Sequence, residues 1–471
     1  MIHFYGEAQK KKDELVKLLA QWVAIPSVYD QTTATEDAPF GTSIKEALQW
    51  FEDLGRKDGF VSKNIDEHAV YIEYGQGEEY IGVFGHGDVV PAGEGWKTDP
   101  YKLHIINDTA YGRGVVDDKG PVLCCYLALK IIKELNIQTK NRIRIVVGGN
   151  EESGFRCIRH YFSKEPHPKL GFTPDAKFPV IHGEKGGMTL EFKGEIDGEN
   201  IEIMAGVSQN TIPSVIKVKM PSQYKYLQEP FYDFITENNL GGTFEGSGEG
   251  VYMELIGVGG HSSKPDQARN PITKLMRFLT LNVSDVWVEA LGKLIMDGNE
   301  RGEKFSLSAV GKCGDLTIVP TMLRLSNGEF SIIFNMRYPE NVTMECINQK
   351  IKKYIIENDL HQWEFKVENI KKPHYVDPSD DLVKKLHHIF IKHTGDTERK
   401  VRVTSAGTYA SEMKNAVVFG AEFGDGSSGN VHGANEYMEI ERLLQAMAIY
   451  TEAMIELSNM EIVTCNDIVY Q

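Results

Sequence analysis

Adjacent carboxylates are the first feature of this sequence that could do chemistry. Asp117 and Asp118 follow a glycine-rich approach at residues 112–114 and precede Pro121, a residue type that the first turn of a helix tolerates. Two neighbouring acids repel each other unless a cation offsets the repulsion. From this stretch alone, a bound metal ion and an exposed charged turn are both adequate explanations.

Two further stretches carry side chains that bind metals. His86 is followed two residues later by Asp88, a spacing at which a carboxylate can orient a metal-binding imidazole. Glu151 and Glu152 come directly after an apolar, strand-like run. Taken alone, a histidine bonded to solvent or backbone and a solvated acidic turn explain these residues as well.

Asp175 follows a proline in a loop and is uninformative by itself. His432 lies in a glycine-rich loop before a helix, and alone it suggests a surface histidine. The candidates together supply two imidazoles and three carboxylates: His86, Asp117, Glu152, Asp175 and His432. Such an inventory suits two divalent ions that share a bridging carboxylate, with Glu151 left over as general base for a bridging water.

Signatures of competing chemistries are missing. The sequence holds no G-x-S-x-G elbow, no Walker lysine loop, no H-E-x-x-H pair, and no G-x-G-x-x-G that opens a helix after a strand. The six cysteines show no C-x-x-C spacing, which favours reduced thiols in a cytoplasmic protein. Without thiolate ligands, a structural zinc site or an iron–sulfur cluster is disfavoured.

The composition indicates a globular protein of two domains, because 471 residues exceed one ordinary core. The 51 Lys and Arg against 67 Asp and Glu give a net charge of −16, which repels phosphate backbones and disfavours nucleic acid as a partner. No run approaches the roughly 20 apolar residues that span a bilayer, and residues 1–12 lack the apolar segment of a signal peptide. We therefore expect a cytoplasmic protein with no membrane partner.

Hydrophobic patterning predicts the elements that must position these side chains. An apolar run predicts a buried helix over residues 121–135, between strands at 81–84 and 142–147. The two strands run directly into His86 and Glu151. Strand, helix and strand with polar residues at the strand ends is the pattern of an α/β sheet, which places its chemistry at the carboxyl ends of the strands.

The composition shifts after residue 186 to short β-type segments and helices, an α+β block that ends near Pro373. The remaining expected elements are helices at 7–23, 43–59, 271–281, 284–296, 344–358, 381–393 and 439–458, and strands at 188–192, 216–220, 251–256 and 329–336.

The metal-binding stretches resemble the ordered motifs of one family. They are Gly85-His86-Gly87-Asp88-Val89-Val90-Pro91, Gly112-Arg113-Gly114 through Asp117-Asp118-Lys119-Gly120-Pro121, Glu151-Glu152-Ser153, Pro174-Asp175, and His432 with Asn435-Glu436-Tyr437. They are similar to the two-zinc metallopeptidases and amidohydrolases, which include aminoacylase, carnosinase, succinyl-diaminopimelate desuccinylase and glutamate carboxypeptidases. Weaker similarities, such as Asn335-Met336-Arg337-Tyr338-Pro339, favour the branch of bacterial peptidase V-type dipeptidases.

The resemblance implies an α/β fold: a catalytic domain with a central mixed β-sheet flanked by helices, plus an inserted α+β lid domain. Together with the composition shift, it places the catalytic domain at residues 1–186 and 374–471 and the lid at residues 187–373.

The resemblance also assigns the metal ligands. Asp117 would bridge the two ions, His86 and Asp175 would hold one of them, and Glu152 and His432 would hold the other. The peptide bond that follows Asp117 would be cis, as it is in the family.

Other positions match the family's catalytic and substrate-binding residues. Asp88 would orient the neighbouring imidazole, and Glu151 would act as general acid and base. In the lid, His261 would stabilise the tetrahedral oxyanion, Arg337 would bind the substrate carboxylate, and Asn210 would contact the substrate. Without the resemblance, a loop histidine, a strand arginine in a salt bridge and a turn asparagine explain the last three.

The implied function is that of a dipeptidase with two divalent metal ions, zinc being favoured over manganese or cobalt. A metal-bridging hydroxide would attack the peptide bond of dipeptides with a free carboxyl terminus. Two alternatives stay open: an N-acyl, for example N-succinyl, amino acid deacylase on the same site, and a non-catalytic metal-binding protein of the same fold. A monomer and a homodimer are both compatible with the sequence. One departure is Asn335, where many relatives have aspartate, which leaves the charge balance around Arg337 open.

Overall fold

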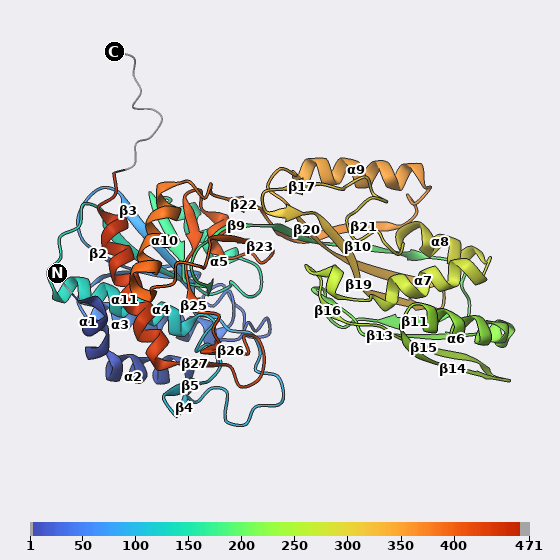
Figure 1. Ribbon diagram of the computed structural model, residues 1–471, viewed down its shortest axis with the longest axis horizontal. Coiled ribbons are helices and arrows are strands. Elements are labelled where there is room, and N and C mark those ends of the chain that lie inside the picture. Colours follow the sequence, from blue (N-terminus) through green and yellow to red (C-terminus); the bar gives the residue numbers. More distant parts are fainter. Residues whose placement is uncertain (1–2, 462–471) are drawn as a thin grey trace, which may run out of the picture. The chain divides into compact units, whose positions relative to one another are not determined.

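The computed structural model describes residues 3–461, which form two compact units (Figure 1). The second unit is an insertion, Glu184–Pro373, together with a short return of the chain at Ser405–Gly407. The other described residues form the first unit. The return at Ser405–Gly407 has no counterpart in the boundaries expected from the sequence; there the main-chain oxygen of Gly407 accepts a hydrogen bond from Lys371 Nζ at 3.3 Å.

A nine-stranded mixed sheet forms the centre of the first unit. Four neighbouring strands, in the order β6, β3, β7 and β24, run parallel, and β2 and β1 continue the sheet antiparallel beyond β6. Every residue of β3 is buried, as expected for a parallel strand with both faces covered. The strands of this sheet are β1 Val61–Ile65, β2 Ala69–Tyr74, β3 Tyr80–His86, β6 Arg142–Gly148, β7 Leu170–Thr173, β9 Ile181–Glu184, β22 His374–Tyr375, β23 Arg402–Thr404 and β24 Ala416–Val418.

The parallel register brings three strand ends together at one edge of this sheet. His86 of β3 lies opposite Gly148 of β6, and Val83 of β3 lies opposite Phe172 of β7. The residues that follow these strands therefore leave the sheet side by side, which is where an α/β sheet places its chemistry.

Helices pack against the sheet of the first unit, and two of them, α4 and α11, are buried along most of their length. The helix expected over residues 7–23 is two helices that meet at Lys11, whose Nζ reaches Glu134 Oε1 at 2.7 Å. The helices of this unit are α1 Phe4–Lys10, α2 Lys12–Val23, α3 Thr42–Lys57, α4 Lys119–Glu134, α5 Arg156–Lys164, α10 Asp381–Thr394 and α11 Ile440–Ser458.

Small sheets complete the first unit. One of them has the strand order β26, β27, β5 and β4, and it pairs Tyr437 with Tyr111. This pairing brings the loop between β26 and β27 next to the loop that follows β5, although the two are more than 300 residues apart. The strands are β4 His104–Ile106, β5 Thr109–Tyr111, β26 Ser428–Gly429 and β27 Tyr437–Glu439, and a separate pair is β8 Ala176–Lys177 with β25 Ala421–Glu422.

An eight-stranded antiparallel sheet forms the second unit, in the order β14, β15, β13, β11, β19, β20, β10 and β21. Its strands are β10 Gly186–Glu195, β11 Glu202–Ala205, β13 Val215–Met220, β14 Gly241–Ser247, β15 Gly250–Ile256, β19 Thr317–Ser326, β20 Glu329–Tyr338 and β21 Glu364–Lys371. The helices are α6 Gln228–Glu237, α7 Pro271–Asn282, α8 Val286–Leu294 and α9 Met344–Glu357, and a ribbon is formed by β12 Thr211–Ile212 and β16 Gly260–His261.

The strands of the second unit alternate between a buried and a more exposed face. In β13, Ile216, Val218 and Met220 are buried and belong to one apolar cluster with Leu275 and Phe278 of α7. The period of two is that of a sheet packed on one face. The predicted fold class, an α/β unit with an inserted α+β unit, is confirmed.

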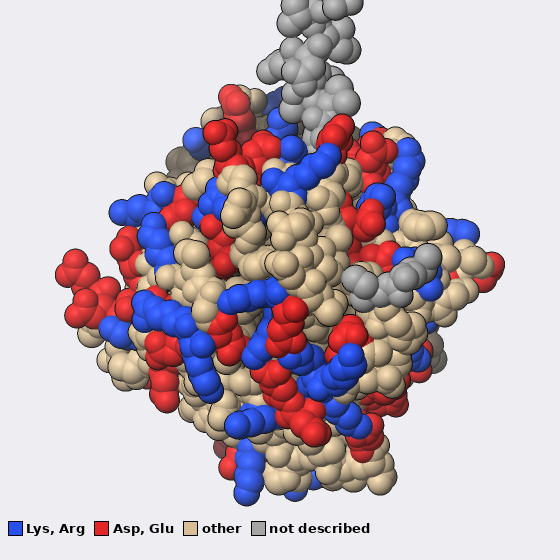
Figure 2. Space-filling view, turned by 90° about the vertical axis from the view of Figure 1, so that its left-hand side faces the viewer, with Lys and Arg blue, Asp and Glu red and all other residues tan. Residues whose placement is uncertain are grey.

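Charges of both signs are interspersed on the face drawn in Figure 2, which shows no continuous field of one sign. Among residues 3–461, no helix is long and apolar enough to cross a bilayer. The five cysteines of the described chain, Cys124, Cys125, Cys157, Cys313 and Cys346, are free thiols, whereas Cys465 lies outside the described residues.

Candidate metal centre

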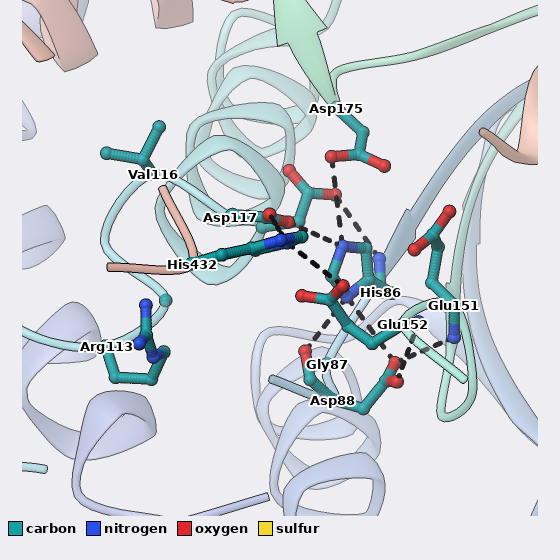
Figure 3. Close-up of polar contacts among 12 residues, drawn as sticks. His86, Gly87, Asp88, Arg113, Val116, Asp117, Glu151, Glu152, Asp175 and His432 are labelled. Atoms are coloured by element: carbon teal, nitrogen blue, oxygen red, sulfur yellow. Dashed lines mark hydrogen bonds and ion pairs between the residues drawn. The ribbon is translucent and has the colours of Figure 1, made fainter. Parts of the chain in front are cut away.

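The candidate ligands of the first unit converge at the edge where the parallel strands end (Figure 3). His86 is the last residue of β3, Glu152 follows β6, and Asp175 follows β7. Asp117 stands before α4, and His432 comes from the loop between β26 and β27. Five residues that are spread over most of the chain thus meet in one cluster.

The Asp117 carboxylate lies between the two imidazoles. Its Oδ1 is 2.9 Å from Nε2 of His86, and its Oδ2 is 3.0 Å from Nε2 of His432. Beyond them, Glu152 Oε2 is 3.1 Å from His432 Nε2, and Asp175 Oδ1 is 3.9 Å from His86 Nε2. The arrangement is a pair of histidine–carboxylate groups that share Asp117.

Asp118 faces differently from its neighbour. Its Oδ2 accepts a hydrogen bond from the main-chain nitrogen of His86 at 3.3 Å, and its side chain is buried. It forms one group of possible ligands with His86 and Asp175, while Asp117 forms another with His86 and Glu152; within each group the atoms lie within 4.8 Å of one another. The bond between Asp117 and Asp118 is cis, as the resemblance implied.

Asp88 contacts His86 and also the two glutamates. Nδ1 of His86 is 2.9 Å from the Asp88 main-chain oxygen and 3.4 Å from its Oδ1. The Asp88 carboxylate accepts hydrogen bonds from the main-chain nitrogens of Glu151 at 3.1 Å and Glu152 at 3.2 Å. The hydrogen bond of His86 therefore goes to the Asp88 main chain, with the carboxylate farther away. That carboxylate fixes the turn that carries both glutamates, a role that the H-x-D spacing does not indicate.

The cluster perturbs the ionisation of its members. Hydrogen bonds to Asp117 and Glu152 raise the pKa of His432 to about 11. Burial, together with the charge of Asp117, raises the pKa of Glu152 to about 7. Burial would also raise the pKa of Asp117, but the hydrogen bonds from His432 and His86 outweigh it and hold that pKa below its usual range. Positive charge is thus strongly favoured at the centre of the cluster.

Two buried carboxylate oxygens, Glu152 Oε1 and Asp118 Oδ1, have no hydrogen-bond partner within residues 3–461. A buried acceptor without a donor is costly, and a bound cation removes that cost. Imidazole nitrogens and carboxylate oxygens are ligands that zinc, manganese and cobalt accept. The residues present therefore fit divalent metal ions.

Lys119 is a buried charge whose role the sequence did not suggest. Its Nζ donates to the main-chain oxygens of Trp22 at 2.9 Å and Ile25 at 2.8 Å, and burial lowers the pKa of this lysine to about 7. Lys119 therefore anchors the end of α2 against the start of α4 and does not pair with the adjacent Asp117 and Asp118. A lysine at the start of an otherwise apolar helix is the sequence signal for such an anchor. The sequence likewise indicated no role for Arg113 and Glu436, which contact the loop that carries Asp117.

Two candidates of the second unit, His261 and Asn210, lie on one ribbon. His261 ends β16, and Asn210 directly precedes β12, whose Thr211 lies opposite His261. The main-chain oxygen of Asn210 accepts a hydrogen bond from the nitrogen of Ser262 at 3.0 Å. The ribbon therefore places His261 and Asn210 near each other.

Arg337, in β20, is a partly buried cation of the second unit. Its Nε is buried and has no hydrogen-bond partner in the described part of the chain, and burial lowers its pKa. Gly187, opposite Arg337 in β10, leaves room for the guanidinium, because a Cβ there would lie 2.6 Å from Arg337 Nη1. The neutral Asn335, two residues before Arg337, accepts a hydrogen bond from Ser262 Oγ at 2.9 Å. A guanidinium in this setting fits an anionic ligand.

The fold and the cluster define a metallopeptidase-like protein with a mixed α/β unit and an inserted α+β unit. The family model described as "Peptidase family M20/M25/M40" matches residues 82–456 of this chain. The chain belongs to this family, and the predicted resemblance is confirmed.

Several known proteins are similar to this chain over nearly its whole length. The Beta-Ala-Xaa dipeptidase of Lactobacillus delbrueckii subsp. lactis is 33% identical over 479 residues, covering 98% of this chain and 99% of the relative. Human carnosine dipeptidase 1 has a similar structure, with a TM-score of 0.58 and 16% identity over 97% of this chain and 99% of that one. A metallo-carboxypeptidase from Sulfolobus solfataricus has a TM-score of 0.59 and 19% identity over 94% and 99%. At these identities the two structures show the shared fold.

Proposed function

We propose that this chain is a metal-dependent dipeptidase that hydrolyses the peptide bond of dipeptides with a free carboxyl terminus. The observation that carries the proposal is the Asp117 carboxylate between the imidazoles of His86 and His432, at 2.9 and 3.0 Å, with Glu151 adjoining the cluster. The name of the Lactobacillus relative, a Beta-Ala-Xaa dipeptidase, supports the same class of substrate.

The ligands would hold two divalent ions, with Asp117 between them, His86 and Asp175 on one and Glu152 and His432 on the other. Zinc is favoured over manganese or cobalt for a site that contains imidazoles. When bound, the ions supply Lewis acidity at the substrate carbonyl and lower the pKa of a bound water.

Glu151 is the proposed general acid and base. It takes the proton of the attacking water and passes it to the leaving amine. Its burial and the hydrogen bond from its main-chain nitrogen to Asp88 Oδ1, at 3.1 Å, support this role because they fix the residue beside Glu152.

His261 is the proposed donor to the oxyanion that forms at the carbonyl. Its Nδ1 accepts a hydrogen bond from the main-chain nitrogen of Ser263 at 3.2 Å, which leaves the proton of a neutral ring on Nε2. Loss of hydration and the charges of Arg337 and Lys264 lower the pKa of His261, which favours the neutral ring. A neutral ring with its proton on Nε2 is a hydrogen-bond donor.

Arg337 is proposed to bind the carboxyl terminus of the dipeptide, and Asn210 is proposed to contact the substrate. The support for Arg337 is its buried Nε without a partner in the described chain and the neutral Asn335 on the same strand. If Arg337 binds the terminal carboxylate, longer peptides would be poor substrates, because their carboxylate lies farther from the peptide bond that is cleaved.

The proposal is tested by metal analysis combined with a substrate panel. Metal content is measured on the purified protein, and zinc-, manganese- and cobalt-loaded samples are assayed on free dipeptides, N-acetyl and N-succinyl amino acids, and tripeptides. We expect free dipeptides to have the highest kcat/KM. Preference for acylated amino acids would instead identify a deacylase, and no hydrolysis in any metal-loaded sample would identify a binding protein.

We also propose a reducing, cytoplasmic location. The support is that all five cysteines of the described chain are free thiols, four of them buried. Fractionation of source cells with antibody detection tests this point, and recovery of the protein outside the cytoplasm would contradict it.

A further inference from the structure

Glu436 is a buried carboxylate that the proposed chemistry does not use. It lies in the loop between β26 and β27, a few residues after His432, and its exposed fraction is 0%. Four donors from the loop before α4 point at it. The donors are Arg113 Nη1 at 2.7 Å and the main-chain nitrogens of Gly114 at 3.1 Å, Val116 at 2.8 Å and Asp117 at 3.1 Å.

These hydrogen bonds hold the main chain from which Asp117 projects. The amide of Asp117 is itself one of the donors, so the direction of its side chain depends on the Glu436 carboxylate. Gly114 has a φ of +90°, a conformation that side chains rarely adopt, and this turn presents its amide to Glu436. The whole loop thus wraps around one carboxylate from a distant part of the chain.

Arg113 extends the contact to a third loop. Its guanidinium is almost fully buried, and its Nη2 donates to the main-chain oxygens of Pro91 and Ala92, each at 3.3 Å. Pro91 and Ala92 belong to the segment that follows His86 and Asp88. The Arg113–Glu436 pair therefore connects the segments that follow β3, precede α4 and carry His432.

Asn435 connects the His432 loop to a second segment, residues 95–97. Its Oδ1 accepts a hydrogen bond from the main-chain nitrogen of Lys97 at 2.8 Å, and its Nδ2 donates to the main-chain oxygen of Gly95 at 3.1 Å. His432 and Asn435 have φ values of +61° and +58°, in the left-handed region that few non-glycine residues adopt. The contacts of Asn435 thus hold the far end of the His432 loop against residues 95–97.

We propose that Glu436 is a positioning residue of the metal centre, which holds Asp117 and the His432 loop in register with each other. This inference rests on the proposed metal site and adds to it the residue that aligns two ligands from opposite ends of the sequence. Removal of a partner that orients a ligand typically weakens metal binding by about 10- to 100-fold.

The test compares Glu436→Gln with the wild type and with Glu73→Gln. Glu73 is a matched control, because it is a buried carboxylate of the first unit that binds Arg144 at 2.7 Å and Arg142 at 2.9 Å, within the β2–β6 pairing. Metal-free protein is titrated with Zn²⁺ in a calorimeter, and the visible absorption spectrum is recorded with Co²⁺. Thermal midpoints of the three proteins are measured in parallel.

We expect Glu436→Gln to weaken binding of Zn²⁺ by about 10- to 100-fold and to alter the Co²⁺ spectrum, because the amide presents a donor to Arg113 and Gly114. Glu73→Gln should lower the thermal midpoint and leave both metal readouts unchanged. Wild-type affinity and spectrum in Glu436→Gln, or an equal loss of affinity in Glu73→Gln, would overturn the inference.

Glu436→Asp provides a second variant if Glu436→Gln does not fold, because it keeps the charge and removes one methylene. We expect the Zn²⁺ affinity of Glu436→Asp to be weaker than that of the wild type, and an unchanged affinity would overturn the role of Glu436. Failure of the wild type to bind Zn²⁺ would refute the proposed function itself, which distinguishes the two failures.

Discussion

At the scale of single residues, Asp117 and Asp118 show how position separates identical side chains. Asp117 contacts both imidazoles, whereas Asp118 accepts a hydrogen bond from the main chain of His86. Glu151 and Glu152 differ in a similar way, because Glu152 contacts His432 at 3.1 Å and Glu151 lies beside the ligands. In the glutamate pair, Glu152 is the candidate ligand, whereas in the aspartate pair only Asp117 contacts both imidazoles, and Asp118 joins a group with His86 and Asp175.

Replacement of Glu151 by Ala tests the proposed proton transfer. We expect kcat on a dipeptide to fall by about 10²- to 10⁴-fold, the usual contribution of a general acid or base. The bound metal, measured by elemental analysis, should stay at the wild-type level, since Glu151 is not among the proposed ligands. Glu134→Ala, on the surface of α4, serves as the control and should keep full activity. Near wild-type turnover in metal-loaded Glu151→Ala would rule out this mechanism.

Replacement of Arg337 by Lys or Ala tests recognition of the substrate carboxylate. A charged hydrogen bond contributes about 1.5–3 kcal/mol, so we expect KM for dipeptides to rise by roughly 10- to 100-fold, with a smaller change in kcat. Dipeptide amides, which lack the carboxylate, should be affected much less. Arg277→Ala is the matched control, because Arg277 is an exposed arginine of the same unit that pairs with Asp297 at 3.2 Å. An equal effect on acids and amides would contradict the assigned role.

At the scale of secondary-structure elements, the site depends on how closely α4 approaches the loop before it. The main-chain nitrogen of Gly120 donates to the oxygen of Gly114 at 3.1 Å, and a Cβ at Gly120 would lie 2.1 Å from the Val115 oxygen. Because the obstructing atom belongs to the backbone, a side chain cannot be accommodated by a rotamer change. The glycine is therefore required for the path of the chain from Asp117 into α4.

Gly120→Ala should destabilise the first unit by about 1–3 kcal/mol or more and weaken metal binding. Gly292→Ala, in α8, is the matched control, because its Cβ would lie 3.5 Å from Thr280 Cγ2, an ordinary contact. That change should be neutral or stabilise the second unit by roughly 0.5–1 kcal/mol, since Ala favours a helix interior. Calorimetry measures both effects, and a harmless Gly120→Ala would refute the close approach.

The contact between α10 and α11 predicts a pH dependence of stability. Lys392 Nζ at 2.5 Å and His393 Nε2 at 2.8 Å contact the Glu452 carboxylate, and although burial opposes them, these contacts lower its pKa from the usual 4.5. A lowered pKa stabilises the folded state above pH 4.5, and the contribution disappears as the pH falls through the folded-state value. Urea unfolding should therefore show the largest deficit of Glu452→Gln near neutral pH and a shrinking deficit below pH 4.5. A deficit that is constant across this range would show that the charge of Glu452 is not involved.

At the scale of the whole molecule, the first unit carries the proposed metal ligands and the second unit carries His261, Asn210 and Arg337. Each unit has its own apolar cluster. Ions that bind only the folded first unit should stabilise that unit, because ligand binding shifts unfolding by mass action.

Removal of metal tests this linkage. A free ion concentration of 1,000 times the dissociation constant stabilises the folded state by about 4 kcal/mol. We expect a chelator to lower the thermal midpoint of the first unit, and added Zn²⁺ to restore it. Asp117→Ala should show little of this shift, and a wild-type midpoint that is insensitive to chelator would contradict the metal site.

Apolar patterns and the family resemblance together predicted the fold class and the segments that carry the proposed ligands. Buried strands such as β3 and apolar helices such as α4 are recognised from continuous apolar runs, and motifs such as His86-Gly87-Asp88 are read over a few residues. The break at Lys11 and the return at Ser405–Gly407 escaped prediction because neither has a periodic signal. Local patterns predict elements better than their interruptions, since interruptions depend on contacts with distant residues.

The family, the order of its motifs and the inventory of two imidazoles and several carboxylates were determined by the sequence itself, because residue types and spacing carry that information. The tertiary structure decided which aspartate of the adjacent pair lies between His86 and His432, and that the Asp88 carboxylate also holds the turn of Glu151 and Glu152. Only the tertiary structure showed that the Glu436 carboxylate accepts a hydrogen bond from the amide of Asp117, 319 positions away in the chain. The physical reason is that hydrogen-bond direction and burial depend on how strands and loops pack, which linear spacing does not encode.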